Sequence, residues 1–433
     1  MQASVIERPA PTVATGGFPR HDVAIIRDLG RQVVALAQSD RYEARRERWR
    51  DVNARRRPDR APVWCWGRPE GFWKEVMPES ALGSTDPFCR NVEATLRRHL
   101  FKDTIGDDHV FEPWWAVSAV FDHDTPYVWG DLPSRILIGH TDLGGFRYDP
   151  PIKTEADYER IGVPHFRLNP AKTDAAVERM EALLGDAMAV RLVYAPPLAP
   201  VLGTYLEHLR GMAPLMQDLA FCPELVHRAM AKFAEGVFQA QRAAEATGRL
   251  TPNNSCAVNQ VHPYFYSDPV NPDAGSGQDG HVGLHGLWTM ANSQEFDQVS
   301  PAMQDEFLLN YQIPLFQQYG AVQYGCCENL TRKIAGVLRI PNLRTFVCSA
   351  WTDLDQVAEA CGTRHVIQWR QSAAAVVLTQ DLGPLREHLE GGMRRLRGHF
   401  YQVALRELET LHGRLDRLHE WTRLAIDAAE RYA

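Results

Sequence analysis

Residues 321–330 read Ala-Val-Gln-Tyr-Gly-Cys-Cys-Glu-Asn-Leu, and this stretch decides the fold. Its apolar start at 321–324 predicts a short buried strand, and a helix is expected over 331–338. The next apolar run, 343–347, predicts another strand after that helix. A strand, a helix and a strand in this order are typical of a parallel sheet with helical crossovers.

Short apolar runs alternate with amphipathic segments on both sides of this stretch. The other predicted strands lie at 62–66, 109–121, 187–194, 284–290, 365–368 and 399–405. The other predicted helices lie at 22–50, 86–101, 203–220, 223–247, 301–319, 353–361, 383–395 and 415–433. Strands alternating with helices in this number predict an α/β fold, a (β/α)8 TIM barrel over 61–433. A flexible tail and a helical extension, together 1–60, are expected to precede it.

A doubly wound open sheet is the structural alternative to the barrel. No segment between a predicted strand and a predicted helix fits the G-x-G-x-x-G turn of a dinucleotide-binding fold, and no P-loop occurs. The Gly- and Asp-rich segment 273–283 lacks the residue order of a calcium loop, and we expect it to form a mobile loop over the barrel mouth.

The composition indicates an ordinary globular protein. The net charge is only −7 over 433 residues, so bulk charge gives no reason to expect nucleic-acid binding. The basic run 45–60 is predicted to be a solvated helix face or a subunit contact. No run approaches the roughly 18–20 apolar residues that cross a bilayer, and residues 1–17 lack the features of a secretory signal. We therefore expect a cytoplasmic protein without membrane contact, whose eight cysteines stay reduced.

Thiols cluster at the ends of two successive predicted strands. In a parallel barrel, functional residues lie where strands end and the following loops begin. Cys326, Cys327 and Glu328 follow the strand at 321–324, and Cys348 ends the next strand, so Cys326 and Cys348 could approach closely. Thiolates are typical zinc ligands, and zinc can keep one position open for a substrate. The alternative is that these cysteines are small residues at crowded strand ends.

Histidines are the first candidates for completing such a ligand set. His399 opens the last predicted strand and is the preferred one. His262, His281 and His285 lie on loops or strand starts that could reach the same mouth. Any one of the 16 histidines is nevertheless more often a surface or core residue.

Two acidic residues and several tryptophans complete the candidates. Glu328 is either a ligand or a general acid/base, and Glu295, which follows the strand at 284–290, could also transfer protons. Glu295 could equally be an ordinary acidic residue before a helix. Tryptophans such as Trp66 and Trp288 suit a pocket for a flat or apolar ligand, although they suit a core equally well.

Five short motifs carry a resemblance. They are Ala-Pro-Val-Trp-Cys-Trp-Gly-Arg at 61–68, Ser-Gln-Glu-Phe at 293–296, Val-Ser-Pro at 299–301, Tyr-Gly-Cys-Cys-Glu-Asn-Leu at 324–330 and Ser-Ala-Trp at 349–351. Together they resemble the uroporphyrinogen decarboxylase-like superfamily, and within it the branch grouped with corrinoid-dependent methyltransferases. The resemblance covers nearly all of the chain beyond the N-terminal region. It implies a (β/α)8 barrel with its site at the C-terminal mouth.

The resemblance also implies a zinc site. Zinc methyltransferases of this superfamily take their ligands from a His-x-Cys element, a later carboxylate and a late cysteine. Cys326 matches the cysteine of His-x-Cys, and Tyr324 stands in place of its histidine, which makes Tyr324 a candidate catalytic residue. Cys348 falls near the carboxylate position and His399 near the late cysteine. The implied metal ligands are therefore Cys326, Cys348 and His399, with Cys327 beside them.

The decarboxylase itself holds a substrate rich in carboxylates with a pair of arginines after the first strand. The corresponding stretch here, 66–73, contains one arginine, Arg68, next to aromatic residues. This difference indicates a smaller and less acidic substrate. The candidate substrate contacts are Trp66, Arg68, Trp288 and His285.

The implied activity is transfer of a methyl group between a small substrate or thiol and a corrinoid. No corrinoid-binding motif of the Asp-x-His-x-x-Gly type occurs, so a partner protein would have to carry the corrinoid. The alternative is a decarboxylase or related lyase that acts on a small, possibly aromatic, carboxylate through acids such as Glu112, Glu295 or Glu328. A metal- or corrinoid-handling binding module is a third reading. The helices near both ends of the chain offer surfaces for a homodimer.

Overall fold

The computed structural model describes residues 17–68, 71–133, 136–139, 146–260, 262–271 and 280–433. A curled sheet of six strands lies at its centre, in the order β1-β12-β11-β10-β9-β8, and every neighbouring pair is parallel. These strands are β1 (Val63–Gly67), β8 (Trp288–Ala291), β9 (Ala321–Tyr324), β10 (Leu343–Cys348), β11 (Val366–Gln371) and β12 (Phe400–Leu408). The sheet forms half of a barrel, and because its strands are parallel, their carboxyl ends all lie at one edge of the sheet.

The remaining strands form three pairs. β2 (Trp114–Ser118) and β7 (Ala189–Val193) are parallel. Two antiparallel pairs lie between them in the sequence, β3 (Phe121–His123) with β6 (Phe166–Leu168) and β4 (Ile136–Gly139) with β5 (Phe146–Asp149). The sequence did not predict these antiparallel pairs, because 121–168 reads as loop-forming sequence rich in Asp and Pro.

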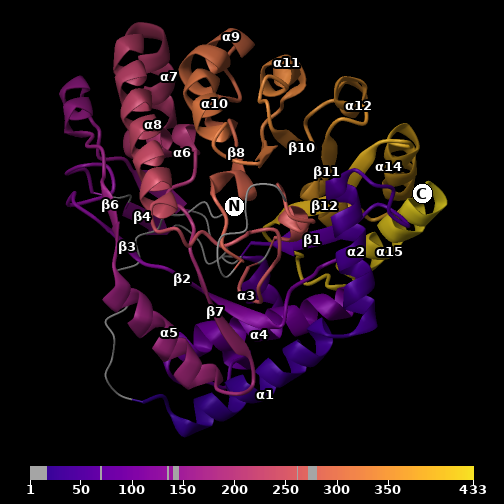
Figure 1. Cartoon of the computed structure of the whole chain (residues 1–433). Coiled ribbons are helices and arrows are strands. Elements are labelled where there is room, and N and C mark those ends of the chain that lie inside the picture. Colours follow the sequence, from indigo (N-terminus) through magenta and orange to yellow (C-terminus); the bar gives the residue numbers. More distant parts are fainter. Residues whose placement is uncertain (1–16, 69–70, 134–135, 140–145, 261, 272–279) are drawn as a thin grey trace.

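Helices cover the outside of the sheet and form an outer arc around β8 to β12 in Figure 1. In the first half of the chain they are α1 (Arg20–Ala37), α2 (Asp40–Ala54), α3 (Phe72–Val76), α4 (Pro87–Ile105), α5 (Pro170–Leu184), α6 (Leu202–Arg210), α7 (Met212–Phe221) and α8 (Pro223–Glu245). In the second half they are α9 (Pro301–Gln304), α10 (Asn310–Phe316), α11 (Ile334–Val337), α12 (Leu354–Cys361), α13 (Ala373–Leu378), α14 (Gly383–Arg395) and α15 (Asp416–Arg431). No helix in these described ranges is long and apolar enough to cross a membrane.

The two faces of the sheet differ in chemistry. The outer face is apolar, and residues such as Phe346 and Ile367 pack in one core with Trp421 of α15. The inner face carries glutamines: the Nε2 atom of Gln368 is 3.5 Å from the Oε1 atom of Gln323 and 3.3 Å from that of Gln402. Side chains alternate between the two faces along a strand, so residues an even number of positions from one of these glutamines in the same regular strand also point inward.

The predicted α/β fold with a parallel sheet and helical crossovers is confirmed, with differences in detail. The helix predicted over 22–50 is divided into α1 and α2, because Ser39 adopts an extended conformation between them. The helix predicted over 203–220 is divided at Gly211, which has a φ of 83°. The predicted tail lies outside the described residues up to residue 16, and the predicted loop at 273–283 lies outside them up to residue 279.

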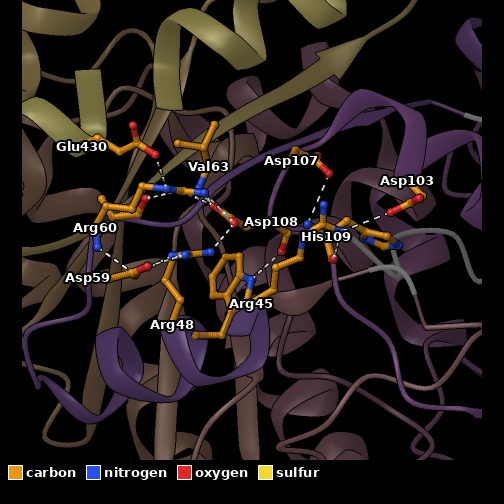
Figure 2. A network of polar contacts seen from close by, with 12 residues as sticks. Arg45, Arg48, Asp59, Arg60, Val63, Asp103, Asp107, Asp108, His109 and Glu430 are labelled. Atoms are coloured by element: carbon orange, nitrogen blue, oxygen red, sulfur yellow. Dashed lines mark hydrogen bonds and ion pairs between the residues drawn. The ribbon is translucent and has the colours of Figure 1, made fainter. Parts of the chain in front are cut away.

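A buried ion cluster joins the N-terminal helices to the first strand, as Figure 2 shows. Asp108 is 1% exposed and accepts hydrogen bonds from Arg48 of α2, at 2.6 Å, and from the Nη1 atom of Arg60, also at 2.6 Å. The backbone N–H of Val63 donates to the same carboxylate at 2.7 Å. The side chain of Asp108 therefore connects α2, the segment before β1 and β1 itself.

Candidate functional site

The turn after β9 depends on Gly325. This residue has a φ of 110°, which L side chains rarely adopt, and its N–H donates to the carbonyl of Ala291 at 2.9 Å. A Cβ atom at this position would lie 2.9 Å from the Cβ of Val347. The chain can therefore turn here only without a side chain, and the turn brings Cys326 to the carboxyl edge of the sheet.

We expect Gly325→Ala to destabilise the fold by about 1–3 kcal/mol, because both backbone strain and a clash oppose the new methyl group. Urea unfolding of the two proteins measures this difference. Gly391→Ala is the matched control: nothing lies within 4 Å of a Cβ there, and its helical position should gain roughly 0.5–1 kcal/mol. Equal stability of the Gly325→Ala variant and the wild type would contradict this role of the glycine.

Three donor side chains meet next to this turn. The Sγ atoms of Cys326 and Cys327 are 3.3 Å apart, and the Sγ of Cys327 is 3.6 Å from the Oε1 atom of Glu407. The ligand atoms of all three residues lie within 4.8 Å of one another. Two thiolates and a carboxylate are a donor set that zinc accepts. The group could therefore hold a metal ion.

Glu407 reaches this group because β12 bulges. Cys65 pairs with Leu405 and Gly67 with Leu408, so one residue of β1 faces two residues of β12. Glu407 lies in this bulge with a φ of 58°. Bulges near sites commonly redirect a side chain. Here the bulge turns the carboxylate of Glu407 toward the thiols.

Arg370 of β11 neutralises the same group. Its side chain is 2% exposed, and its Nη1 atom is 3.1 Å from the Oε1 atom of Glu407 and 3.6 Å from the Sγ of Cys326. Its Nε donates to Gln368 at 2.8 Å, which fixes the guanidinium plane. A buried arginine in contact with a thiol favours the anionic form of that thiol.

The two thiols differ in acidity. The hydrogen bond from the Cys327 thiol, opposed by burial and assisted by the charge of Arg370, lowers the pKa of Cys326 well below its usual value. Donating that hydrogen bond, together with burial, raises the pKa of Cys327. The pair therefore favours one proton shared between two sulfurs, with the negative charge on Cys326.

Glu328 and Tyr324 organise the surroundings of the thiols. Glu328 is buried, and its carboxylate accepts hydrogen bonds from the backbone N–H groups of Cys326 and Ser293, both at 2.8 Å. Burial raises its pKa. Tyr324 is fully buried on the outer face, and its hydroxyl is 3.1 Å from the Oε1 atom of Gln312 in α10. Two of the three predicted catalytic residues, Tyr324 and Glu328, therefore lie two residues from Cys326 in the chain, and their polar atoms are held by other groups.

Glu295 is the second acidic candidate, and its carboxyl group is half satisfied. It follows β8 in a 3-10 turn (Gln294–Phe296) and is 5% exposed. Thr204 of α6 donates to Oε1 at 2.7 Å, whereas Oε2 has no hydrogen-bond partner among the described residues. Burial raises the pKa of Glu295 to about 7. A carboxyl group with this pKa can serve as a proton donor near neutral pH.

Glu295→Gln should flatten the pH dependence of stability. The folded pKa of about 7 lies above the unfolded value of about 4.3, so the folded chain binds the proton more tightly. The stabilisation is complete below the unfolded pKa and is lost as pH rises through the folded pKa. Between about pH 5 and about pH 8 the wild type should lose roughly 2–3 kcal/mol more than the variant.

Urea unfolding at the two pH values measures this difference. Glu359→Gln, at an exposed position on α12, should leave the wild-type slope unchanged. A Glu295→Gln variant with the wild-type slope would show that the carboxyl group titrates at its ordinary pH.

Two predicted metal ligands are not part of the group around Cys326. Cys348 pairs in register with Trp369, whose ring lies against α14 on the outer face, and the Sγ of Cys348 is 3.6 Å from the carbonyl of Thr352. His399 precedes β12, so it lies at the amino edge, and its Nε2 atom is 3.1 Å from the carbonyl of Ala358 in α12. The opening residue of a parallel strand lies a whole strand length from the carboxyl edge, and this separates His399 from Cys326.

The predicted substrate contacts divide between the two edges in the same way. Trp66 and Arg68 lie at the carboxyl end of β1, and the Nε atom of Arg68 is 2.9 Å from Glu409, just beyond β12. Trp288 begins β8, and His285 precedes it and is exposed, so both lie at the amino edge. Trp66 and Arg68 are thus the predicted contacts that share an edge with the thiols.

Other histidines are placed as follows. His262 is near Trp66, with ring centroids 6.5 Å apart, and stacks on Tyr264 at 5.0 Å. Burial lowers its pKa well below the usual value. His281 lies 6.4 Å from the ring of Tyr194. Of these two, His262 is the one close to a residue at the carboxyl edge of β1.

Sequence reasoning missed Arg370 and Glu407. Both follow the predicted ends of their strands, at 368 and 405, by two residues, which is where functional residues of a parallel barrel lie. The same rule that selected Cys326 could therefore have selected them. Arg406, whose guanidinium carbon lies 5.8 Å from the centroid of the Trp64 ring, was also missed, and it too follows the predicted end of its strand.

Comparisons with known proteins add no identification. The sequence matches no protein-family model, and no curated protein matches it.

Proposed function

We propose that the protein is a methyltransferase that moves a methyl group between a small substrate or thiol and a corrinoid, with zinc bound by thiolates. The observation that carries this proposal is the meeting of Cys326, Cys327 and Glu407 at the carboxyl edge of the sheet. The resemblance of the motifs around 293–301 and 324–330 to the corrinoid-dependent branch of the uroporphyrinogen decarboxylase-like superfamily supports the same reaction.

Charge supports a dication at this place. Two thiolates and one carboxylate would be a strongly anionic group in a largely buried setting. Arg370 offsets one of these charges, and a divalent ion would offset the other two. Unbalanced charge in a buried site is costly, so the donor set fits Zn²⁺ on chemical grounds.

Each residue of the group then has a role. Cys326, Cys327 and Glu407 would hold the metal, which, when bound, keeps a thiol substrate deprotonated at neutral pH. Arg370 would hold Glu407 and Cys326 in place and limit the basicity of the Cys326 thiolate. Glu328 accepts a hydrogen bond from the backbone N–H of Cys326 and thereby fixes the backbone that carries the thiol. Trp66 and Arg68, on the neighbouring strand end, would contact the substrate.

Closure of the sheet into a complete (β/α)8 barrel is part of the proposal. β2 and β7 bring the six parallel strands of the central sheet to the eight that a barrel needs. The N–H of Asp108 donates to the carbonyl of Val63 at 2.7 Å, which supports the approach of the segment before β2 to β1. The corrinoid partner, a cytoplasmic location and a homodimer remain predictions from the sequence.

A carboxylate lyase is the second candidate, and two buried arginines favour it. Arg406 is 6% exposed, and its Nε and Nη1 atoms have no partner among the described residues. The Nη2 atom of Arg370 is also buried without a hydrogen-bond partner among the described residues. Free guanidinium N–H groups suit a carboxylate substrate, and Glu295 could deliver the proton that replaces a lost carboxyl group. In this reaction the thiols would be dispensable.

Metal analysis and two assays of the purified protein test the choice. We expect about one zinc ion per chain, in line with the single three-donor group among the residues that the structure describes. We also expect thiol-dependent demethylation of free methylcobalamin, which stands in for the carried corrinoid. Protein that stays metal-free after incubation with zinc and that does not demethylate methylcobalamin would contradict methyl transfer. Release of carbon dioxide from small aromatic carboxylates, lost in Glu295→Gln, would support the lyase instead.

A further inference from the structure

Cys326 and Cys327 are adjacent in sequence and in space. Their Sγ atoms are 3.3 Å apart, close to the contact distance of two sulfur atoms. Cys326 is 1% exposed, whereas Cys327 is only partly buried and is therefore accessible to a small solute. Of the other six cysteines, only Cys222 is partly exposed.

We propose that Cys326 and Cys327 form a reversible redox pair that closes to a vicinal disulfide when a peroxide reaches them. One thiol attacks the peroxide, becomes a sulfenic acid and releases one water molecule. The other thiol then displaces the sulfenic oxygen as a second water molecule, and the S–S bond forms. Two thiols are oxidised and one peroxide is reduced, so atoms and electrons balance.

The chain geometry makes such a bond easy to reduce again. Adjacent Cα atoms across a trans peptide are about 3.8 Å apart, below the range of about 4.4–6.8 Å that unstrained disulfides prefer. Strained disulfides are the labile ones that small dithiols reduce. The pair is therefore suited to a switch and poorly suited to a permanent crosslink.

The ion pair between Arg370 and Glu407 limits the electrostatic cost of oxidising the two thiols. When Cys326 loses its charge, the Nη1 atom of Arg370 still has the carboxylate of Glu407 at 3.1 Å. The buried arginine is thus not left without a counter-ion. Oxidation would at the same time remove two of the three donors, so a bound metal would be released. This last consequence rests on the proposed function, whereas formation of the disulfide does not.

Peroxide treatment of the full-length, reduced and metal-free protein tests the inference. After one equivalent of hydrogen peroxide, the unfolded protein should contain two fewer alkylatable thiols than the eight of the sequence. Mass spectrometry should place the loss of two hydrogen atoms in the peptide that contains residues 326 and 327, and dithiothreitol should reverse it. Cys327→Ser should prevent this loss, and Cys222→Ser, which removes the other partly exposed thiol, should not.

The outcomes separate this inference from the metal proposal. A peptide that keeps both alkylatable thiols, or that gains two oxygen atoms on one cysteine as a sulfinic acid, would overturn the redox pair, and the peptide of the wild type decides this without any variant. A disulfide in a protein that never binds zinc would support the redox pair and contradict the metal site. A protein that binds zinc but whose Cys326 and Cys327 form no disulfide after peroxide treatment would support the metal site and contradict the redox pair.

Discussion

A Cys326→Ser variant should lose its zinc and its methyl-transfer activity together. Cys326 is the thiol whose pKa is lowered by the hydrogen bond from Cys327 and by Arg370, and serine offers no comparable anion at neutral pH. Loss of even an outer-shell partner lowers metal affinity by about 10–100-fold, so loss of this ligand should cost more than about 100-fold. Competition with a chromophoric chelator measures the affinity of both proteins.

Cys348→Ser is the matched control. The thiol of Cys348 is equally buried, but it faces the outer helices and contacts the carbonyls of Ser349 and Thr352, which a serine hydroxyl can also use. This variant should keep zinc and activity. Full zinc content in Cys326→Ser, or loss of zinc in Cys348→Ser with unchanged folding, would show that the metal lies elsewhere.

Asp108→Ala should lower the free energy of unfolding by about 3–5 kcal/mol, because it removes the buried counter-ion of two buried arginines. Arg48 and Arg60 would keep only the exposed carboxylates of Asp59 and Glu430, respectively. The side chains of Arg48 and Arg60 are only 9% and 10% exposed, and both donate to this carboxylate at 2.6 Å. The N–H of Val63 would lose its acceptor as well. Urea unfolding followed by tryptophan fluorescence measures the change.

Asp59→Ala provides the comparison within the same cluster. Asp59 also pairs with Arg48, at 2.5 Å, but its side chain is 65% exposed. An exposed ion pair contributes about 0–1 kcal/mol, so this variant should stay close to the wild type. Similar losses in the two variants would mean that burial does not set the strength of these pairs.

The fold was largely readable from the sequence because apolar runs at 321–324 and 343–347 alternate with helices. Six of the predicted strands lie in the central sheet in the predicted direction. The antiparallel pairs at 121–168 were not predicted because strands of three or four residues are too short to show a clear hydrophobic periodicity. The pairing of β2 with β7 joins segments about 70 residues apart, which local patterns do not reveal.

The site was readable only in part. Cys326 and Cys327 were found because they directly follow an obvious strand. Glu407 depends on a bulge, and a bulge moves a side chain to the other face without leaving a signal in the hydrophobic pattern. Cys348 was expected to lie close to Cys326 at the end of the neighbouring strand, but its register with Trp369 places its side chain on the outer face of the sheet. Successive side chains of a strand point to opposite faces, so an error of one residue in the predicted register places a side chain on the wrong face.

The pairing of β1 with β12 has a consequence for the synthesis of the chain. Val63 pairs with Val403, so this edge of β1 has no partner strand until Val403 has been synthesised. Until then the inner tryptophan of β1, Trp64, lacks the glutamine that accepts its N–H, Gln402. The nascent chain therefore exposes an unpaired strand edge while the residues between β1 and β12 are made, which is the kind of surface that chaperones bind.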